Sequence, residues 1–444
     1  MNRQTEAPPA AVPVAAKQAG EAQSRWGWVE PEVWTERMLT ALEQGVKGGS
    51  WFSLIDKVYA PENLRTAFQR VRANRGSAGV DQVTIERFAA DLDAQLQRLS
   101  RELREQTYRP QGVKRVWIPK PGSREKRPLG IPTVRDRVVQ TALRNVLEPI
   151  FERDFAAQSY GFRPGLGCKD ALRRVQDLLD QGYCWVVDAD LQGYFDSLPH
   201  EPLMRRVAQK VSDGRILSLL RNYLKQEVMD GLERWTPETG SPQGAVISPL
   251  LSNIYLDPLD WLLERAGYQM VRYADDFVVL CRTPEEAERA LVLIREWVGQ
   301  AELRLHPDKT QLVDAGLPGG FDFLGYHFER GYRWPRKKSQ AKLKDALRPK
   351  TKRTNGNSLV TIIATINPIL RGWFEYFKHS HKTTFRPLDG WVRMRLRSVL
   401  RKRIGLKGCG RGADHQRWPN HFFTAQGLFS LDAAFQLARQ PALR

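Results

Sequence analysis

The sequence predicts an α+β protein, with an antiparallel sheet in its first three quarters and a basic α-helical region after it. Short apolar strands alternate with helices in the middle of the chain, and two of them, 271–273 and 277–280, are close enough to form a hairpin. After about residue 330 the aliphatic strands give way to helices rich in Lys and Arg. A central hairpin favours an α+β sheet over a doubly wound one. The 444 residues suffice for two or three domains of about 100–200 residues each.

The N-terminal third is predicted to be helical with one hairpin. Within 23–110, Leu96, Leu99 and Leu103 recur three and four positions apart, as on one face of a helix. Residues 113–119, a Pro-Gly turn and residues 127–131 predict a pair of strands. A long amphipathic helix is expected over 134–150. Residues 1–22 are rich in Ala, Pro and Gln, and we expect a flexible tail there.

Acidic residues stand at the ends of the apolar strands. The run 185–187 leads into Asp188 and Asp190, which are two apart and share one face of a strand. Asp275 and Asp276 stand at the expected tip of the central hairpin, where an Asp pair is also ordinary turn composition. Strand interiors disfavour Asp, and like charges brought together cost free energy unless a cation neutralises them. Carboxylates from two strands therefore favour a Mg²⁺ site.

The charge distribution points to a polyanionic partner. The chain has 69 Lys and Arg against 50 Asp and Glu, a net charge of +19. Residues 330–407 hold 22 of the basic residues and three acids, which equals the whole net charge. Such an excess is either a solvated basic face or the footprint of a nucleic acid, and its one-sidedness favours nucleic acid. No apolar run of about 18 residues occurs, so no membrane partner is expected.

The four cysteines lie far apart and form no C-x-x-C pair. This spacing favours a reducing compartment over a disulfide framework. The expected location is a bacterial-type cytoplasm or nucleoid.

Four blocks of the sequence resemble the motifs of reverse transcriptases. Residues 273–276 (Tyr-Ala-Asp-Asp) resemble the signature tetrapeptide of that superfamily, and residues 190–196 (Asp-Leu-Gln-Gly-Tyr-Phe-Asp) resemble its first catalytic block. Residues 240–244 (Gly-Ser-Pro-Gln-Gly) resemble the block between these two, and residues 118–132 resemble the fingers block. The tetrapeptide alone is weak evidence, whereas four blocks in the family's order are specific.

Within that superfamily the chain resembles the group II intron-encoded reverse transcriptases and maturases, in the form without a C-terminal H-N-H nuclease domain. The upstream block 74–81 and the segments 159–164 and 323–326 carry this resemblance, and 370–377 resembles the maturase thumb. The resemblance covers roughly residues 50–430. Retron enzymes share the tetrapeptide, but their Val-Thr-Gly motif is absent here.

The resemblance implies a right-hand polymerase, with fingers and palm built on an antiparallel sheet and followed by an α-helical basic thumb or maturase domain. We place the flexible tail at 1–22 and the fingers and palm at 23–330. The RNA-binding thumb or maturase domain follows at 331–405. Residues 406–444 are assigned to a C-terminal tail or the remnant of a DNA-binding region.

The resemblance also implies the reaction and its residues. A primer 3′-hydroxyl attacks the α-phosphate of a deoxynucleotide, with two Mg²⁺ ions, or Mn²⁺ as a substitute, in the site. Asp190 and Asp275 are the expected metal ligands, and the backbone carbonyl of Leu191 is a further one. Asp276 belongs to the catalytic set, either as a ligand or as a support for one. Asp188 is expected to be supporting structure.

Further residues are expected at the incoming nucleotide. Lys120 and Arg127, in the fingers hairpin, either reach the triphosphate or are solvated basic side chains. Phe195 either packs under the sugar and excludes a 2′-hydroxyl, or is a core aromatic. Gln243 either lies against the nucleotide or template, or satisfies the backbone of its own turn.

The expected partners are group II intron RNA, an RNA template, a DNA primer or target, and deoxynucleoside triphosphates. The residues expected to bind RNA are Arg336, Lys337, Lys338, Lys342 and Lys344. A splicing-only maturase and a reverse transcriptase domesticated for repair or defence are the alternatives. Asp190 and Asp275 are both present, which favours an active polymerase. Since no paired cysteines or histidine cluster follow the basic region, we expect no cut of the second DNA strand.

Overall fold

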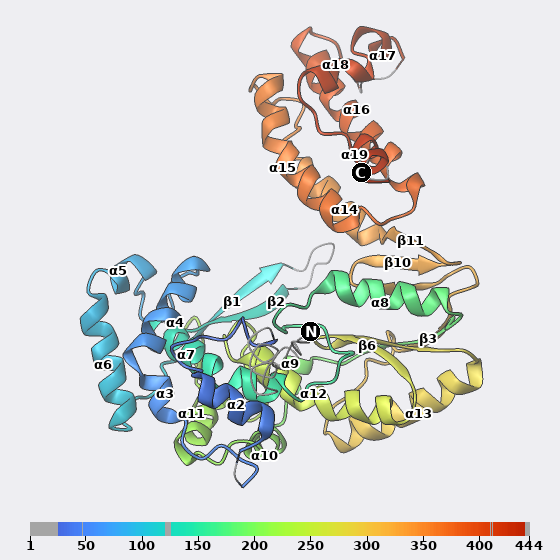
Figure 1. The fold of residues 1–444 in the computed structure, drawn as a ribbon. Coiled ribbons are helices and arrows are strands. Elements are labelled where there is room, and N and C mark those ends of the chain that lie inside the picture. The colour runs from blue at the N-terminus through green and yellow to red at the C-terminus, as the bar shows by residue number, and fades with distance from the viewer. Residues whose placement is uncertain (1–24, 47, 120–125, 409, 411, 440–444) are drawn as a thin grey trace, which may run out of the picture.

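The computed structural model describes residues 25–46, 48–119, 126–408, 410 and 412–439. The expected tail at 1–22 and the expected nucleotide contact Lys120 lie outside these residues. In the described part of the chain, no helix combines the length and the apolar character needed to cross a lipid bilayer. Helices surround small β-sheets, and a helical C-terminal part rises from one side of the molecule (Figure 1).

The predicted helical N-terminal part is confirmed. Two of its helices begin at capping threonines, Thr35 and Thr84, whose hydroxyls accept hydrogen bonds from the backbone N–H groups of Met38 and Arg87. They bury their apolar faces against one another and against the helix that follows the fingers hairpin. The helices are α2 (Glu36–Gln44), α3 (Ile55–Tyr59), α4 (Pro61–Ala73), α5 (Ile85–Ala89) and α6 (Leu92–Arg104).

The predicted fingers hairpin is confirmed as well. β1 (Val113–Pro119) and β2 (Lys126–Ile131) pair antiparallel, with Ile118 opposite Arg127. β4 (Val228–Asp230) and β5 (Glu233–Trp235) extend them into a sheet of order β2-β1-β4-β5. The long helix expected next is α7 (Val134–Glu152), whose N-cap Thr133 accepts from the N–H of Asp136.

A second sheet forms the centre of the molecule and has the strand order β6-β7-β3-β8. All its neighbouring strands are antiparallel, as the sequence predicts. Tyr273 pairs with Asp276, so Ala274 and Asp275 form a two-residue turn. The strands are β3 (Trp185–Asp190), β6 (Gln269–Tyr273), β7 (Asp276–Cys281) and β8 (Gln311–Asp314).

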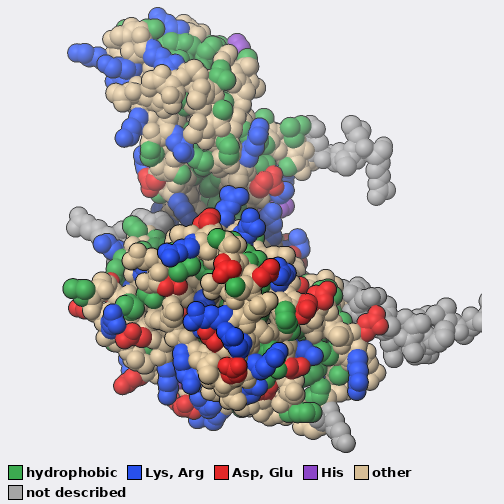
Figure 2. Space-filling view, turned by 90° about the vertical axis from the view of Figure 1, so that its left-hand side faces the viewer, with side chains coloured by type: hydrophobic (Ala, Val, Ile, Leu, Met, Phe, Trp, Pro, Cys, Tyr) green, Lys and Arg blue, Asp and Glu red, His purple; other side chains and the backbone are tan. Residues whose placement is uncertain are grey.

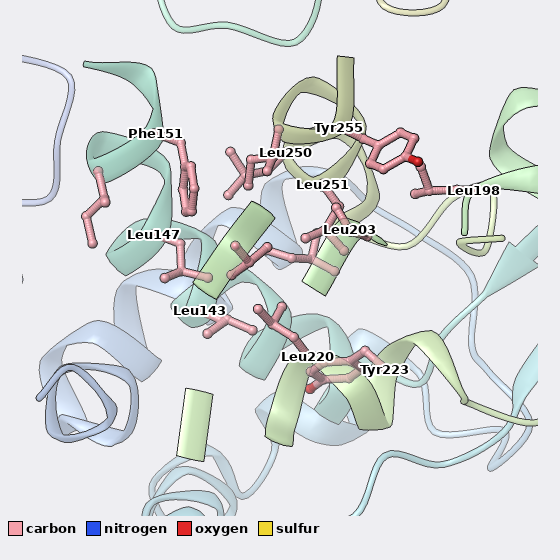
Figure 3. Close-up of a cluster of buried hydrophobic side chains, with 14 of the residues drawn as sticks. Leu143, Leu147, Phe151, Leu198, Leu203, Leu220, Tyr223, Leu250, Leu251 and Tyr255 are labelled. Carbon is pink, nitrogen blue, oxygen red and sulfur yellow. The ribbon is translucent and has the colours of Figure 1, made fainter. Parts of the chain in front are cut away.

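Both faces of this sheet are packed. Val187, Ala189 and Phe277 face a large apolar cluster that also contains Leu147 of α7 and Leu251. Figure 3 shows part of this cluster, with leucines from several helices pointing toward one another. The helices of this part of the chain are α8 (Cys168–Asp180), α9 (Tyr194–Ser197), α10 (His200–Ala208), α11 (Gly214–Leu224), α12 (Ser248–Arg265) and α13 (Pro284–Gln300).

The opposite face of the sheet carries Val186, Val278 and Leu280, which pack against α8 and a third sheet. That sheet contains β9 (Phe321–Phe323), β10 (Tyr326–Glu329) and β11 (Tyr332–Pro335), in the order β11-β10-β9. The domain boundary that we placed at residue 330 therefore falls in the turn of the β10–β11 hairpin, and β11 lies beyond it.

The C-terminal helices have an apolar core of their own. Residues 406–444, expected as a tail, contribute Phe423, Leu431 and Phe435 to this core. Asp389 of the long helix α16 accepts hydrogen bonds from Leu431 N at 2.9 Å and Ser430 Oγ at 2.6 Å. The elements are α14 (Lys337–Leu347), α15 (Leu359–Phe377), the 3₁₀ turn η1 (Lys382–Thr384), α16 (Phe385–Arg403), α17 (Asp414–Arg417), α18 (Asn420–Ala425) and α19 (Leu431–Arg439).

Candidate active site

Strand register brings the predicted acids together at one end of the central sheet. Asp190, the last residue of β3, lies directly opposite Asp276, the first residue of β7. Residues opposite each other on antiparallel strands point to the same face. Asp188 shares that face because it is two residues before Asp190, and Asp275 lies in the adjoining turn. The structure thus assembles four carboxylates from two strands.

Burial and mutual repulsion act strongly on these acids. Burial, together with the negative charges of Asp188, Asp275 and Asp190, raises the pKa of Asp276 to about 7, and the charge of Arg336 opposes this shift. Burial also raises the pKa of Asp188 to about 6, although a hydrogen bond donated by Gln311 at 3.2 Å opposes this shift. Asp188 therefore interacts electrostatically with the other carboxylates of the acidic cluster.

Asp275 occupies the turn, and burial raises its pKa. A hydrogen bond from its own backbone N–H lowers the pKa, the charge of Asp190 raises it, and the charges of Arg127 and Arg272 lower it. Arg127 of the fingers hairpin therefore lies within electrostatic reach of the palm acids.

A cation that the sequence analysis did not single out contacts the cluster. Lys309 Nζ lies 2.6 Å from Asp190 Oδ2, and both groups are partly exposed. The loop that carries Lys309 is held in place by a hydrogen bond from His306 N to Asp190 O at 2.8 Å. Lys309 is 119 residues from its partner in sequence, so no local pattern marks it.

The acidic cluster has the chemistry of a divalent-cation site, without a closed cage of side chains. Among the described residues, no group of three or more His, Cys, Asp or Glu side chains could by itself hold a metal ion. Mg²⁺ does not require such a cage, since it binds one or two carboxylates and completes its shell with water and substrate phosphates. The carboxylates repel one another, and the Lys309 ammonium already lies against Asp190. A bound cation would relieve this repulsion. Asp190, Asp275 and Asp276 are the residues that would hold the ion.

Of the other residues that the sequence analysis assigned to the site, Phe195, Gln243 and Leu191 lie in the described part of the chain. Phe195 of α9 is half-buried, with its ring 5.5 Å from that of Tyr194 in an edge-on contact. Gln243 accepts from Gly130 N at 2.6 Å through its backbone carbonyl, and its Nε2 lies 3.4 Å from Asp196 Oδ2. The 240–244 loop therefore connects the fingers strand β2 to α9. Leu191 is buried and forms an isolated bridge with Leu305 next to the cluster.

The basic residues begin next to the acids. Arg336 stands at the N-cap of α14, and Lys337 and Lys338 follow it on the surface. With Gln311 they line an open cavity of about 1130 Å³. Because Gln311 also contacts Asp188, this cavity adjoins the acidic cluster. Lys342 and Lys344 lie further along α14. In Figure 2, Lys and Arg side chains gather on both sides of the constriction between the helical part and the rest of the molecule.

Comparison with known proteins gives the family. Residues 118–328 match the family model "Reverse transcriptase (RNA-dependent DNA polymerase)", and residues 340–418 match "Group II intron, maturase-specific domain". Protein YkfC of Escherichia coli K12 is 35% identical over 350 residues, which cover 69% of this chain and 86% of YkfC. The chain belongs to the group II intron-encoded reverse transcriptase and maturase family. As a member of that family it is an RNA-directed DNA polymerase, with divalent metal ions as cofactors and nucleic acids as substrates.

The chain is also similar to a further curated relative and to solved structures. The group II intron-encoded protein LtrA of Lactococcus lactis is 35% identical over 230 residues, which cover 51% of this chain and 37% of LtrA. Among solved structures, a partial Cas6-RT-Cas1–Cas2 complex is 26% identical over 56% of this chain and 41% of the other, with a TM-score of 0.37. Apo telomerase from Candida tropicalis is 13% identical over 72% and 67% of the two chains, with a TM-score of 0.44.

Proposed function

We propose that this chain copies an RNA template into DNA at the acidic cluster, and that its helical C-terminal part binds group II intron RNA to assist splicing and mobility. The observation that carries the first half is the convergence of Asp190, Asp275 and Asp276 from two strands at one end of the sheet. The observation that carries the second half is the basic run of α14, which lies beside that cluster.

In this proposal the three Asp side chains hold two Mg²⁺ ions, which would neutralise charge between the primer hydroxyl and the nucleotide phosphates. Arg127 reaches toward the triphosphate with its planar fork. Phe195 lies beneath the sugar and Gln243 against the nascent base pair. Residues 23–330 serve as fingers and palm, and residues 331–405 as the RNA-binding thumb or maturase domain.

The test of the polymerase half is primer extension by the purified chain, with a DNA primer on an RNA template. We expect synthesis with Mg²⁺, synthesis with altered fidelity with Mn²⁺, and none after chelation with EDTA. An absence of synthesis with either ion, from a protein that binds the template–primer duplex, would contradict the proposal and favour a splicing-only maturase.

The test of the RNA-binding half is splicing of the intron that encodes the chain, at near-physiological Mg²⁺ concentration. We expect the chain to accelerate splicing of that intron and to leave an unrelated group II intron unaffected. Equal effects on both introns would contradict intron-specific binding.

A further inference from the structure

Arg272 is a charged residue in β6, near the tip of the apolar hairpin, and it is completely buried. Its Nε and Nη2 donate to the two carboxylate oxygens of Asp260 at 2.7 and 2.5 Å. Its Nη1 donates to Asn253 Oδ1 at 3.0 Å and to the backbone carbonyl of Ala274 at 2.9 Å. Ala274 is the residue directly before Asp275, so the guanidinium reaches the backbone of the catalytic turn.

The other partners of Arg272 fix the guanidinium in space. Asn253 and Asp260 are seven residues apart on α12, which places them two turns apart on one helix face. Asn253 Nδ2 also donates to the carbonyl of Gly161 at 2.9 Å. A Cβ added at Gly161 would lie 2.2 Å from Ala274 N, so this loop backs directly against the turn. The turn is therefore clamped between α12 and the loop that contains Gly161.

The turn needs such a clamp because its backbone is strained. Ala274 has a φ of 61°, in the left-handed region that residues with a Cβ disfavour. A residue in this conformation persists when its surroundings over-determine it. The hydrogen bond from Arg272 and the contact with Gly161 are the two constraints that hold Ala274 there.

Stability alone does not account for the buried pair. Replacing a buried ion pair by apolar residues of similar volume is often neutral or stabilising, whereas removing one partner leaves a costly unpaired charge. Apolar side chains cannot replace the planar guanidinium, whose N–H groups donate hydrogen bonds to α12 and to the turn at the same time.

We propose that Arg272 is a positioning residue that holds the carbonyl of Ala274, so that the turn presents the Asp275 carboxylate to the divalent ion. This inference rests on the proposed role of Asp275 as a metal ligand. Asp260 and Asn253 orient the guanidinium, and Gly161 lets the loop approach closely enough to support the turn.

The experiment separates positioning from folding with a paired substitution. Arg272→Met with Asp260→Leu removes the charges together, so the fold is expected to keep its melting temperature within a few degrees. Mg²⁺ binding to the protein alone is measured by calorimetry, and kcat and KM for the deoxynucleotide by primer extension. We expect Mg²⁺ affinity to fall about tenfold and kcat about 100-fold, because small misplacements of reacting groups have effects of this order, with KM nearly unchanged.

The matched control is Arg135→Met with Glu102→Leu, an ion pair between α7 and α6 away from the turn. It should leave Mg²⁺ affinity and kcat as in the parent. If the Arg272–Asp260 double variant fails to fold, Arg272→Lys decides, since Lys keeps the charge toward Asp260 but lacks the fork. Its Mg²⁺ affinity and kcat should still fall.

A folded Arg272 variant with parental Mg²⁺ affinity and kcat would overturn the positioning role. Asp275→Asn is measured beside it to separate this failure from failure of the proposed function. If Asp275→Asn loses Mg²⁺ binding while the Arg272 variant keeps it, only the positioning role is wrong. If neither variant changes Mg²⁺ binding, the assignment of Asp275 as a ligand is wrong.

Discussion

At the residue scale, the ion pair between Lys309 and Asp190 places one positive charge of the protein against the acidic cluster. A divalent ion that binds Asp190 must compete with the ammonium 2.6 Å from its Oδ2. We predict that Lys309→Met lowers the Mg²⁺ concentration needed to raise the melting temperature of the free protein. Exposed ion pairs contribute about 0.2–1 kcal/mol, so the change should not exceed about fivefold. Lys225→Met, at an exposed Lys on another part of the surface, is the control. An unchanged or higher Mg²⁺ requirement would show that Lys309 does not compete for the site.

Phe195 is the residue whose two interpretations a single substitution separates. Its ring is half-buried and packs edge-on against Tyr194. We predict that Phe195→Val admits ribonucleotides, because the smaller side chain opens space for a 2′-hydroxyl beneath the sugar. The measurement is the ratio of kcat/KM for deoxy- and ribonucleotides. Intact synthesis with an unchanged ratio would return Phe195 to the role of a core aromatic.

Some residues of the candidate site are marked by a local sequence pattern, and others are not. Asp190 stands out because it ends an apolar strand and Asp275 because it lies in the turn of an apolar hairpin, whereas the roles expected of both come from the resemblance to reverse transcriptases. Arg272 left a similar signal, a charge inside the apolar run 270–273, which the sequence analysis did not use. Lys309 left none, because its contact with Asp190 exists only once β8 pairs with β3. Tertiary pairing therefore supplies the part of the site that sequence reasoning misses.

At the element scale, the strands of the fingers hairpin and of the central hairpin could be predicted, whereas β11 could not. In the central hairpin, successive side chains point to opposite faces of the sheet, and both faces are buried. Its two strands were expected at 271–273 and 277–280. β11 (Tyr332–Pro335) contains Arg and aromatic residues and reads as part of the basic helical region. It is a strand because its backbone pairs with β10, a partner that composition does not reveal.

The basic helix α14 is the element assigned to RNA. We predict that neutralising its four lysines and its N-cap arginine weakens binding to structured RNA and flattens the dependence of log affinity on log salt. Each lost phosphate contact should reduce the slope by about 0.7–0.9 units, because each contact releases a condensed counterion. The measurement is a salt titration of RNA binding. The residues to neutralise are Arg336, Lys337, Lys338, Lys342 and Lys344.

The control for α14 removes the same charge elsewhere and keeps the net charge of the two proteins equal. Its substitutions fall in α3, α4 and α6, at Lys57, Arg65, Arg98, Arg101 and Arg104. A larger loss of slope in the control than in the α14 variant would place the main RNA contacts on the N-terminal helices. Equal slopes for the α14 variant and the parent would make α14 a solvated face.

At the scale of the whole molecule, a large apolar cluster packs against the face of the central sheet that is opposite to the acids, and so stabilises the strands that carry them. Leu147 of α7 is fully buried in this cluster (Figure 3). We predict that Leu147→Ala lowers the free energy of unfolding by about 2–5 kcal/mol, because it leaves a cavity in a packed core. Leu317, which is 58% exposed, is the matched control, and Leu317→Ala should change stability by about 0.5 kcal/mol or less. Denaturant unfolding measures both, and equal effects would contradict the burial described here.

The central claim is that the carboxylates gathered by β3, β7 and the turn between β6 and β7 perform RNA-templated DNA synthesis. The most direct measurement is primer extension on an RNA template by the Asp275→Asn variant, beside Glu296→Gln, a carboxylate-to-amide change at an exposed position of α13. A neutral amide cannot replace the charge that holds a divalent ion. We predict that Asp275→Asn abolishes synthesis while binding of the template–primer duplex persists, and that Glu296→Gln matches the parent. Full synthesis by Asp275→Asn would contradict the account.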